Sequence, residues 1–206
     1  MVRTDRRPRR RLDPDSRRAA ILEAAAAAFA AHPYAEVTIS SIAAEAYSSN
    51  ALVYRYFANK EDLYAEVVRV AIADLLTRQA EALDALPDGV PVRDRIRAAT
   101  MVYLDHIATH PDAWAMPMRR PGGEPAAVAE LRARTRCDYV KRLQDLLVPS
   151  TQARHDYALW GYFGFIDAAA LRWVGKGCPE EDRWALIDAA LGALEGAAEP
   201  DRKSVV

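Results

Sequence analysis

Hydrophobic residues recur three and four positions apart along most of the chain, which is the spacing of one face of an α-helix. The first such run contains Ile21, Ala25 and Phe29 and follows an Asp-Pro-Asp-Ser helix start signal. It is expected to end just before Pro33, because proline disfavours helical backbone in the preceding residue. No run of useful length alternates between hydrophobic and polar residues as a strand would. The pattern therefore predicts an all-α fold.

Capping and stop signals divide this pattern into about nine helices. Thr38 is a suitable cap for a short second helix, and Ser48 or Ser49 for a short third one. Asn59 is expected to cap a long fourth helix that ends at Pro87-Asp88-Gly89. The later helices are expected at residues 92–109, 125–147, 152–174 and 180–198, with a short segment at 112–118 that Pro117 breaks.

The net charge of −1 does not by itself indicate a nucleic-acid partner. However, residues 1–60 contain ten Lys and Arg against six Asp and Glu, and six of these arginines lie within residues 1–12. Phosphate binding depends on local charge, so this distribution favours a basic head on an acidic body. The expected segments are a basic disordered arm (1–16), a DNA-binding head (17–63), a helical body (64–198) and a C-terminal tail (199–206).

Other compositional features argue against several classes of protein. Cys137 and Cys178 are isolated from each other, which disfavours a disulfide framework or a structural zinc site. The basic N-terminus is not followed by the apolar run of a signal peptide. Asp167 and Arg172 interrupt the longest apolar stretch, which therefore resembles a buried helix more than a membrane span. We expect a soluble cytoplasmic protein without a cofactor, a bound metal or a membrane partner.

Two short helices joined by a short turn and flanked by longer helices are typical of a helix-turn-helix. The second short helix of such a motif fits the major groove of DNA, with its N-terminal residues facing base edges. Here Asn50 could form two hydrogen bonds with adenine, and Ala51 and Leu52 could contact a thymine methyl group. Tyr54 and Arg55 are better placed for phosphates.

The segment RRAAILEAAAAAFAAHPYAEVTISSIAAEAYSSNALVYRYFANKEDLYAEV resembles the DNA-binding domain of the TetR (tetracycline repressor) family. The spacing matches without a gap over residues 17–63, and the N-terminal position of the block fits the usual layout of that family. The resemblance implies that Thr38 caps the second helix and that Lys60 contacts the DNA backbone. The full set of expected DNA-binding residues is Thr38, Ser40, Ser41, Tyr47, Ser48, Ser49, Asn50, Ala51, Leu52, Tyr54, Arg55 and Lys60.

The turn departs from the family pattern. Similar proteins usually have Gly and then Val where this chain has Tyr47 and Ser48, and a Gly is also common at the position of Ala51. If the turn requires a positive φ at position 47, Tyr47 has a steric cost that Gly avoids. Tyr47 could instead extend toward the phosphates.

The body contains more aromatic and sulfur-containing side chains than a tight helical core needs. The resemblance implies a cavity between the middle helices, which would accept a small apolar or aromatic effector. The candidate effector-binding residues are Tyr103, His106, Trp114, Met118, Tyr139, Leu143, Trp160, Phe163 and Ile166. His106 and His110 also have a spacing that could serve a metal, but no third ligand is evident.

Two later helices carry stripes that suit a contact between two copies of the chain. Small residues allow helices to approach closely, and two helices from each copy could form a four-helix bundle. A homodimer also suits a palindromic operator in double-stranded DNA. The candidate interface residues are Trp160, Gly161, Gly164, Ala168, Leu171, Trp184, Ile187, Leu191 and Leu194.

The sequence thus predicts a transcriptional repressor that an effector releases from DNA by shifting the population between two states. Three other interpretations are open. The same fold could act as an activator or as an effector-independent DNA-binding protein. A helical domain could also be an enzyme, although no catalytic triad, Gly-rich phosphate loop or metal triad is present. Finally, the chain could be a structural dimer whose head no longer binds DNA.

Overall fold

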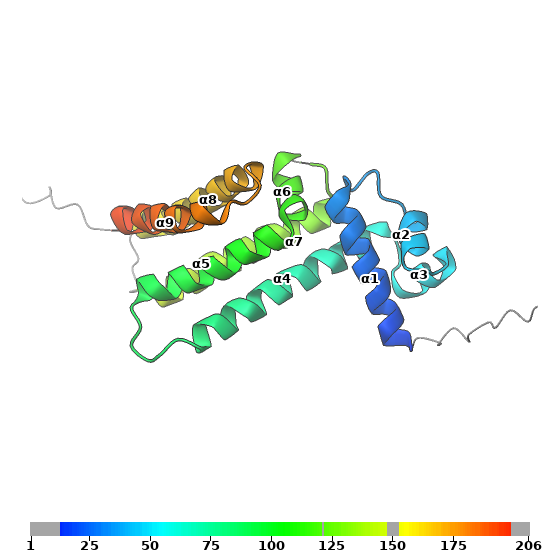
Figure 1. Cartoon of the computed structure of the whole chain (residues 1–206), viewed down its shortest axis with the longest axis horizontal. Coiled ribbons are helices and arrows are strands. Elements are labelled where there is room, and N and C mark those ends of the chain that lie inside the picture. Colours follow the sequence, from blue (N-terminus) through cyan, green and yellow to red (C-terminus); the bar gives the residue numbers. More distant parts are fainter. Residues whose placement is uncertain (1–12, 121, 148–152, 199–206) are drawn as a thin grey trace, which may run out of the picture. The chain divides into compact units, whose positions relative to one another are not determined.

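A computed structural model of the chain describes residues 13–120, 122–147 and 153–198. Within these ranges the chain forms nine α-helices and one 3-10 turn and contains no strand (Figure 1). The prediction of an all-α fold is therefore confirmed. Most of the expected basic arm (residues 1–12) and the expected tail (residues 199–206) lie outside the described residues.

The helix boundaries follow the capping signals closely. Asp13 caps the first helix, and its carboxylate accepts hydrogen bonds from the backbone N–H groups of Asp15 and Ser16. Hydrogen bonds from Ser16 lower the pKa of this carboxyl group. The elements are α1 (Pro14–Ala31), α2 (Ile39–Glu45), α3 (Asn50–Tyr56), α4 (Lys60–Asp84), α5 (Val92–Thr109), α6 (Pro111–Arg119), α7 (Ala126–Leu146), α8 (Ala153–Gly175), a 3-10 turn (Glu180–Asp182) and α9 (Arg183–Ala198).

The expected break at Pro117 is wrong, because α6 continues through this residue to Arg119. Proline inside a helix removes one backbone hydrogen bond and crowds the preceding turn. Here side-chain packing holds the part of the helix that precedes this defect. Ala115 is fully buried, and the indole of Trp114 donates a hydrogen bond to the hydroxyl of Tyr103 on α5.

The chain divides into two compact units, residues 1–67 and residues 68–206. In the described part of the first unit, α2 packs against both α1 and α3. The interior is formed by apolar residues from α1, α2, α3 and the start of α4, and its fully buried members are Ile21, Ala25, Ile42, Val53 and Leu63. Each short helix therefore has one face fixed in this core, while its opposite face is available to solvent.

In the second unit, α8 and α9 lie side by side (Figure 1), and both pack against α5. Their shared core also includes residues of α6 and α7. Arg183 at the start of α9 is largely buried, where it pairs with Asp105 on α5 and with Glu180. No helix in the described part of the chain has the length and apolar character needed to cross a membrane.

Three residues expected at a contact between two copies lie instead inside this core. Ile187, Leu191 and Leu194 are buried against α5 and α8 of the same chain, so their assignment to an intermolecular interface is wrong. Leu171 is half-buried against the same core. Periodicity identified the apolar face of α9 correctly, but a neighbouring helix of the same chain covers that face.

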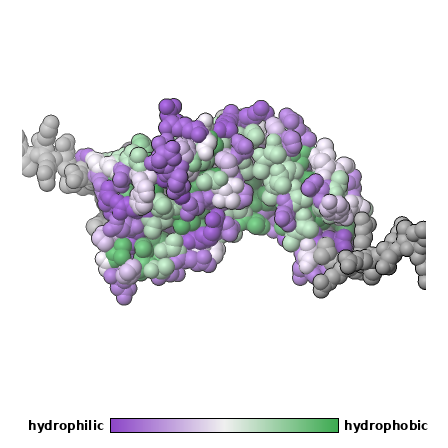
Figure 2. All heavy atoms as spheres, in the orientation of Figure 1, coloured by the Kyte–Doolittle hydropathy of each residue, from purple (hydrophilic) through white to green (hydrophobic). Residues whose placement is uncertain are grey.

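Other apolar groups do reach the surface, where Figure 2 shows hydrophobic residues among hydrophilic ones. On α8 and α9 the large exposed hydrophobic side chains are Tyr157, Trp160, Phe165 and Trp184. Small exposed residues lie between them, namely Gly161, Gly164 and Ala168. Trp160 is among these exposed side chains, so its assignment to the effector site stays a prediction.

Candidate nucleic-acid interface

The start of α2 is fixed by a reciprocal pair of capping hydrogen bonds. Thr38 accepts a hydrogen bond from the backbone N–H of Ser41 over 3.0 Å, and the Ser41 hydroxyl accepts one from the backbone N–H of Thr38 over 3.2 Å. The Ser41 hydroxyl also donates to the carbonyl of Thr38. Both hydroxyls thus hold the N-terminal turn of α2 in shape, which satisfies N–H groups that have no partner within the helix.

The turn between α2 and α3 closes through two characteristic backbone hydrogen bonds. The N–H of Ser48 donates to the carbonyl of Ala43 over 2.8 Å, and the N–H of Tyr47 donates to that of Ala44 over 3.1 Å. This pattern is a Schellman motif, which needs a left-handed residue immediately after the helix end. Tyr47 occupies that position with a φ of 49°, so the turn does require a positive φ where similar proteins have glycine.

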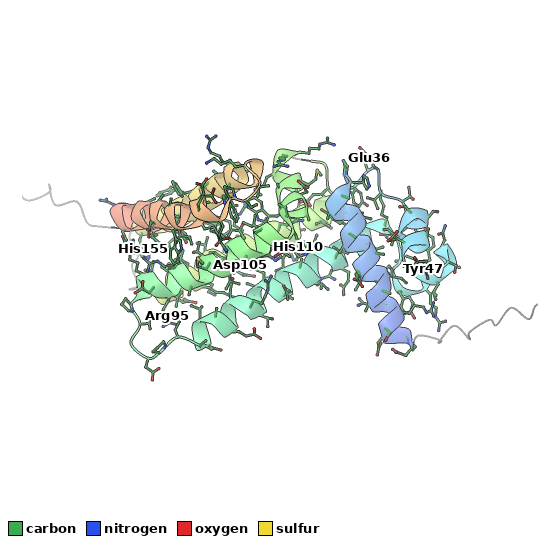
Figure 3. The ribbon with its side chains drawn as sticks, in the orientation of Figure 1. Glu36, Tyr47, Arg95, Asp105, His110 and His155 are labelled. Carbon is green, nitrogen blue, oxygen red and sulfur yellow. The ribbon has the colours of Figure 1, made fainter. Side chains whose placement is uncertain are left out.

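The Tyr47 side chain extends from this turn into solvent (Figure 3), with 89% of its surface exposed. A non-glycine residue in the left-handed region has a cost of about 1–3 kcal/mol. Nothing in the packing of the first unit offsets this cost, because the ring is so exposed. A DNA contact is one way in which the side chain could compensate for its backbone conformation.

Replacing Tyr47 with Gly is expected to raise the thermal midpoint of the first unit, by the equivalent of about 1 kcal/mol, because glycine adopts a positive φ without steric strain. Circular dichroism during heating would measure this shift. Tyr47→Asn is the matched variant, since asparagine tolerates the left-handed region better than tyrosine but less well than glycine. A lower midpoint for Tyr47→Gly than for the unchanged protein would contradict this account of the turn.

The third helix presents a distinct outer face. Ser49 caps α3 by accepting a hydrogen bond from the N–H of Leu52, and Val53 anchors the helix in the core with no exposed surface. The opposite face carries two pairs of exposed residues, Asn50 with Tyr54 and Ala51 with Arg55. The two members of each pair lie about one helical turn apart. Leu52 is half-buried at the edge of that face.

The side chain of Asn50 is oriented by the preceding helix. Its amide nitrogen donates a hydrogen bond to the hydroxyl of Ser40 on α2 over 2.8 Å. Ser40 and Asn50 are both exposed, so the remaining amide hydrogen and the amide oxygen of Asn50 can pair with an external partner. An adenine base accepts and donates hydrogen bonds in the pattern that an Asn amide matches.

Two of the expected DNA-binding residues point elsewhere. The Ser48 hydroxyl is buried and has no hydrogen-bond partner within the described ranges, so its contact with DNA stays a prediction. The Lys60 ammonium donates to the backbone carbonyls of Tyr34 and Val37 instead of extending outward. Lys60 matches the family pattern, but that pattern does not specify the direction of the side chain.

The second unit contains a chain of contacts that links much of the expected effector set. The Tyr103 hydroxyl accepts a hydrogen bond from the Trp114 indole and donates one to Asp167 on α8, both over 2.9 Å. Arg136 on α7 pairs with the other oxygen of Asp167 over 3.1 Å and lies over the ring of Phe163. Four helices, α5 to α8, therefore meet at the carboxylate of Asp167.

Burial changes the protonation behaviour of this cluster. It raises the pKa of Asp167, although the hydrogen bond from Tyr103 and the charge of Arg136 act in the opposite direction. Burial likewise raises the pKa of Tyr103 well above its ordinary value and that of the adjoining Tyr139. Tyr139 packs edge-on against Phe163, so the cluster is an aromatic region with one partly shielded ion pair.

Sequence reasoning missed Asp167 and Arg136 as members of this cluster. They are 31 residues apart, so no local spacing links them. The one available signal was an aspartate within the most apolar helix, where an acidic side chain needs a partner. The expected Leu143 and Ile166 are buried in the adjacent core, and Met118 on α6 is half-buried.

His106, one turn after Tyr103 on α5, has a different polar partner. Its ring accepts a hydrogen bond from Arg78 over 3.1 Å when the histidine is neutral. Burial, together with the nearby His110 and Arg78, lowers the pKa of His106 to about 4. In the part of the chain that the structure describes, no group of three or more His, Cys, Asp or Glu side chains could hold a metal ion.

Two short helices around a tight turn, with polar side chains on the outer face of the second, define a helix-turn-helix protein that carries a separate helical unit. A family model described as "Bacterial regulatory proteins, tetR family" matches residues 21–67. Residues 21–67 therefore resemble the N-terminal domain of the TetR family of bacterial regulatory proteins. This likeness favours a regulator over the enzyme alternative.

Two curated relatives match about half of the chain. The HTH-type transcriptional repressor SCO4008 of Streptomyces coelicolor is 38% identical over 101 residues, which are 48% of this chain and 47% of the relative. The HTH-type transcriptional activator FasR of Mycolicibacterium smegmatis is 32% identical over 97 residues, which are 47% of this chain and 43% of the relative. The chain thus matches less than half the length of either protein.

Solved structures extend the likeness of the fold to both units. The crystal structure of a tetR-family transcriptional regulator from Streptomyces coelicolor superposes with a TM-score of 0.76 and 24% sequence identity. This alignment covers 91% of the present chain and 84% of the other. At this identity the match establishes the shared helical architecture and nothing finer.

Proposed function

We propose that this chain is a DNA-binding transcriptional regulator that represses genes from a palindromic operator and is released by a small apolar or aromatic effector. The observation that carries this proposal is the outer face of α3, where Asn50, Ala51, Tyr54 and Arg55 are exposed together. These side chains combine base-edge hydrogen bonding, apolar contact and phosphate binding. Ser49 and Val53 hold the helix that carries them from its other side.

A homodimer would supply the two heads that a palindromic operator requires. The surface proposed for this contact is formed by the exposed aromatic and small residues of α8 and α9, among them Trp160 and Trp184. Aromatic residues are enriched in contacts between subunits, where they often act as anchors. Light scattering at micromolar concentration should therefore give twice the mass of one chain.

The effector is proposed to bind at the aromatic cluster around Asp167. Tyr103, Trp114 and Phe163 would contact an apolar or aromatic body, while Asp167 and Arg136 would pair with a polar group on it. An effector changes DNA affinity only if it binds one of two protein states more tightly than the other. Release from DNA requires tighter binding to the state that does not bind the operator.

The two curated relatives differ in the sign of the regulation that their names give. One similar protein is named as a repressor and the other as an activator. Repression is the simpler outcome, because a dimer on an operator needs only to occupy DNA that the transcription machinery requires. An effector-independent or activating role is the alternative.

A selection from random duplex DNA tests the proposal directly. The full chain should enrich a palindromic sequence, which is then used in fluorescence-anisotropy titrations at several salt concentrations. Arg55→Ala should weaken binding and reduce the slope of log K against log salt by about 0.9, because one phosphate contact is lost. Arg134→Ala is the matched control, since Arg134 is exposed on α7 of the other unit.

Enrichment of no sequence, or equal binding by the Arg55→Ala protein at every salt concentration, would refute DNA reading by this face. A reporter gene placed behind the selected operator then gives the sign of regulation. Lower expression in the presence of the protein supports repression, and higher expression supports the activator alternative.

A further inference from the structure

Lys60, the first residue of α4, makes three contacts in the described structure. Its ammonium nitrogen donates hydrogen bonds to the backbone carbonyl of Tyr34 over 2.9 Å and to that of Val37 over 3.0 Å. The same nitrogen lies 4.2 Å from the centre of the Tyr34 ring, within the range of a cation–π interaction. An ammonium group has three N–H donors, and these three partners match them.

The partners of Lys60 are themselves rigidly held. The Tyr34 ring packs against Phe29 of α1 and Tyr64 of α4, with ring centres 5.9 and 5.2 Å away. Val37 is buried, with 3% of its surface exposed. Lys60 therefore joins the start of α4 to a fixed segment between α1 and α2. A phosphate contact by this ammonium would require at least one of these interactions to break.

The segment held by Lys60 leads directly into the DNA-reading helices. Val37 precedes Thr38, whose side chain caps α2. The first turn of α2 carries Ser40, which orients the amide of Asn50 on α3. The position of the Val37 carbonyl thus affects where α2 begins, and through Ser40 it affects the side chain that faces a base.

We propose that Lys60 is a positioning residue that fixes the entry to α2 for DNA reading, and that it is not a phosphate ligand. This inference rests on the proposed function and assigns one residue within the same site. The amino group contributes through its geometry, with two carbonyls and one ring around it. Its charge alone is not sufficient for this role.

Two variants separate positioning from charge. Lys60→Met removes the ammonium, and Lys60→Arg keeps the charge but places a planar guanidinium where a compact ammonium fits two carbonyls and a ring. Both are titrated with the selected operator below their thermal midpoints, beside the unchanged protein and Arg55→Ala. Positioning predicts that both variants bind about tenfold more weakly, the loss expected for a charged hydrogen bond. Their salt slopes should equal that of the unchanged protein.

A phosphate ligand predicts the opposite pattern. Lys60→Arg would then bind as the unchanged protein does, and Lys60→Met would lose about 0.9 from its salt slope, as Arg55→Ala is expected to do. That result would overturn the inference. If Lys60→Met fails to fold, the affinity and salt slope of Lys60→Arg still decide between the two roles.

A measurement without DNA keeps this inference distinct from the proposed function. In nitrogen–proton NMR spectra of the free protein, Lys60→Arg should shift the amide signals of Val37, Thr38 and Ser40. Unchanged signals at these three residues would overturn the anchoring role. If the unchanged protein binds no DNA while these signals do shift, the proposed function fails and the anchoring of the α2 entry stands.

Discussion

Replacing Leu191 with Ala is expected to lower the free energy of unfolding of the second unit by about 2–5 kcal/mol. Leu191 lies on α9 with 1% of its surface exposed, inside the core shared with α5 and α8. The substitution removes buried apolar atoms and leaves a cavity that rigid neighbouring helices fill only in part. Urea unfolding followed by circular dichroism would measure the change.

Trp184→Ala is the matched control on the same helix, because the Trp184 side chain is 56% exposed. Its effect on the unfolding free energy is expected to stay within about 0.5 kcal/mol, as for most surface substitutions. It should instead weaken self-association in sedimentation experiments. If Leu191→Ala left the urea midpoint unchanged and abolished the dimer, Leu191 would lie in the intermolecular contact. Its placement in the core of a single chain would then be wrong.

Replacing Asn50 with Ala is expected to weaken binding to the selected operator by roughly 5- to 150-fold. This range corresponds to the 1–3 kcal/mol of discrimination that one bidentate contact with a base supplies. The loss should concentrate at a single base pair, so operators changed at that pair should bind the variant and the unchanged protein more equally. Anisotropy titrations against single-base operator variants would measure this pattern.

Ser40→Ala is the control for Asn50, because the Ser40 hydroxyl accepts the hydrogen bond that orients the Asn50 amide. A smaller loss of affinity is expected for it alone, and no additional loss once Asn50 is already Ala, since the two residues act through one contact. If Asn50→Ala weakens binding equally to every DNA sequence, Asn50 contacts the DNA backbone and does not read a base.

Local features made the helices predictable from the sequence. Thr38 and Ser49 are caps whose hydrogen bonds connect residues only three positions apart, so their sequence context suffices to identify them. The glycine of similar proteins raised the question of a positive φ at Tyr47, and the structure answers it with a φ of 49°. Pro117 shows the limit of such reasoning, because distant packing outweighs a local signal there.

Side-chain direction was less predictable, since it depends on residues far away in the sequence. Lys60 bonds to carbonyls that precede it by 23 and 26 residues, and the spacing of the motif says nothing about these partners. Leu191 poses a related problem, because periodicity reveals an apolar face without revealing which chain covers it. Likewise, the place of the Asp167 carboxylate in the cluster became apparent only from its contacts with Tyr103 and Arg136.

Tyr47 and Ser48 give the turn of the reading head an unusual chemical character. The first has a backbone conformation that glycine would adopt more easily, and the second buries a hydroxyl without a described partner. Natural proteins retain such locally unfavourable choices mainly where function requires them. At these two adjacent positions, substitutions that stabilise the fold would differ from substitutions that preserve operator recognition. Sequence changes at this turn would therefore separate the requirements of folding from those of DNA binding.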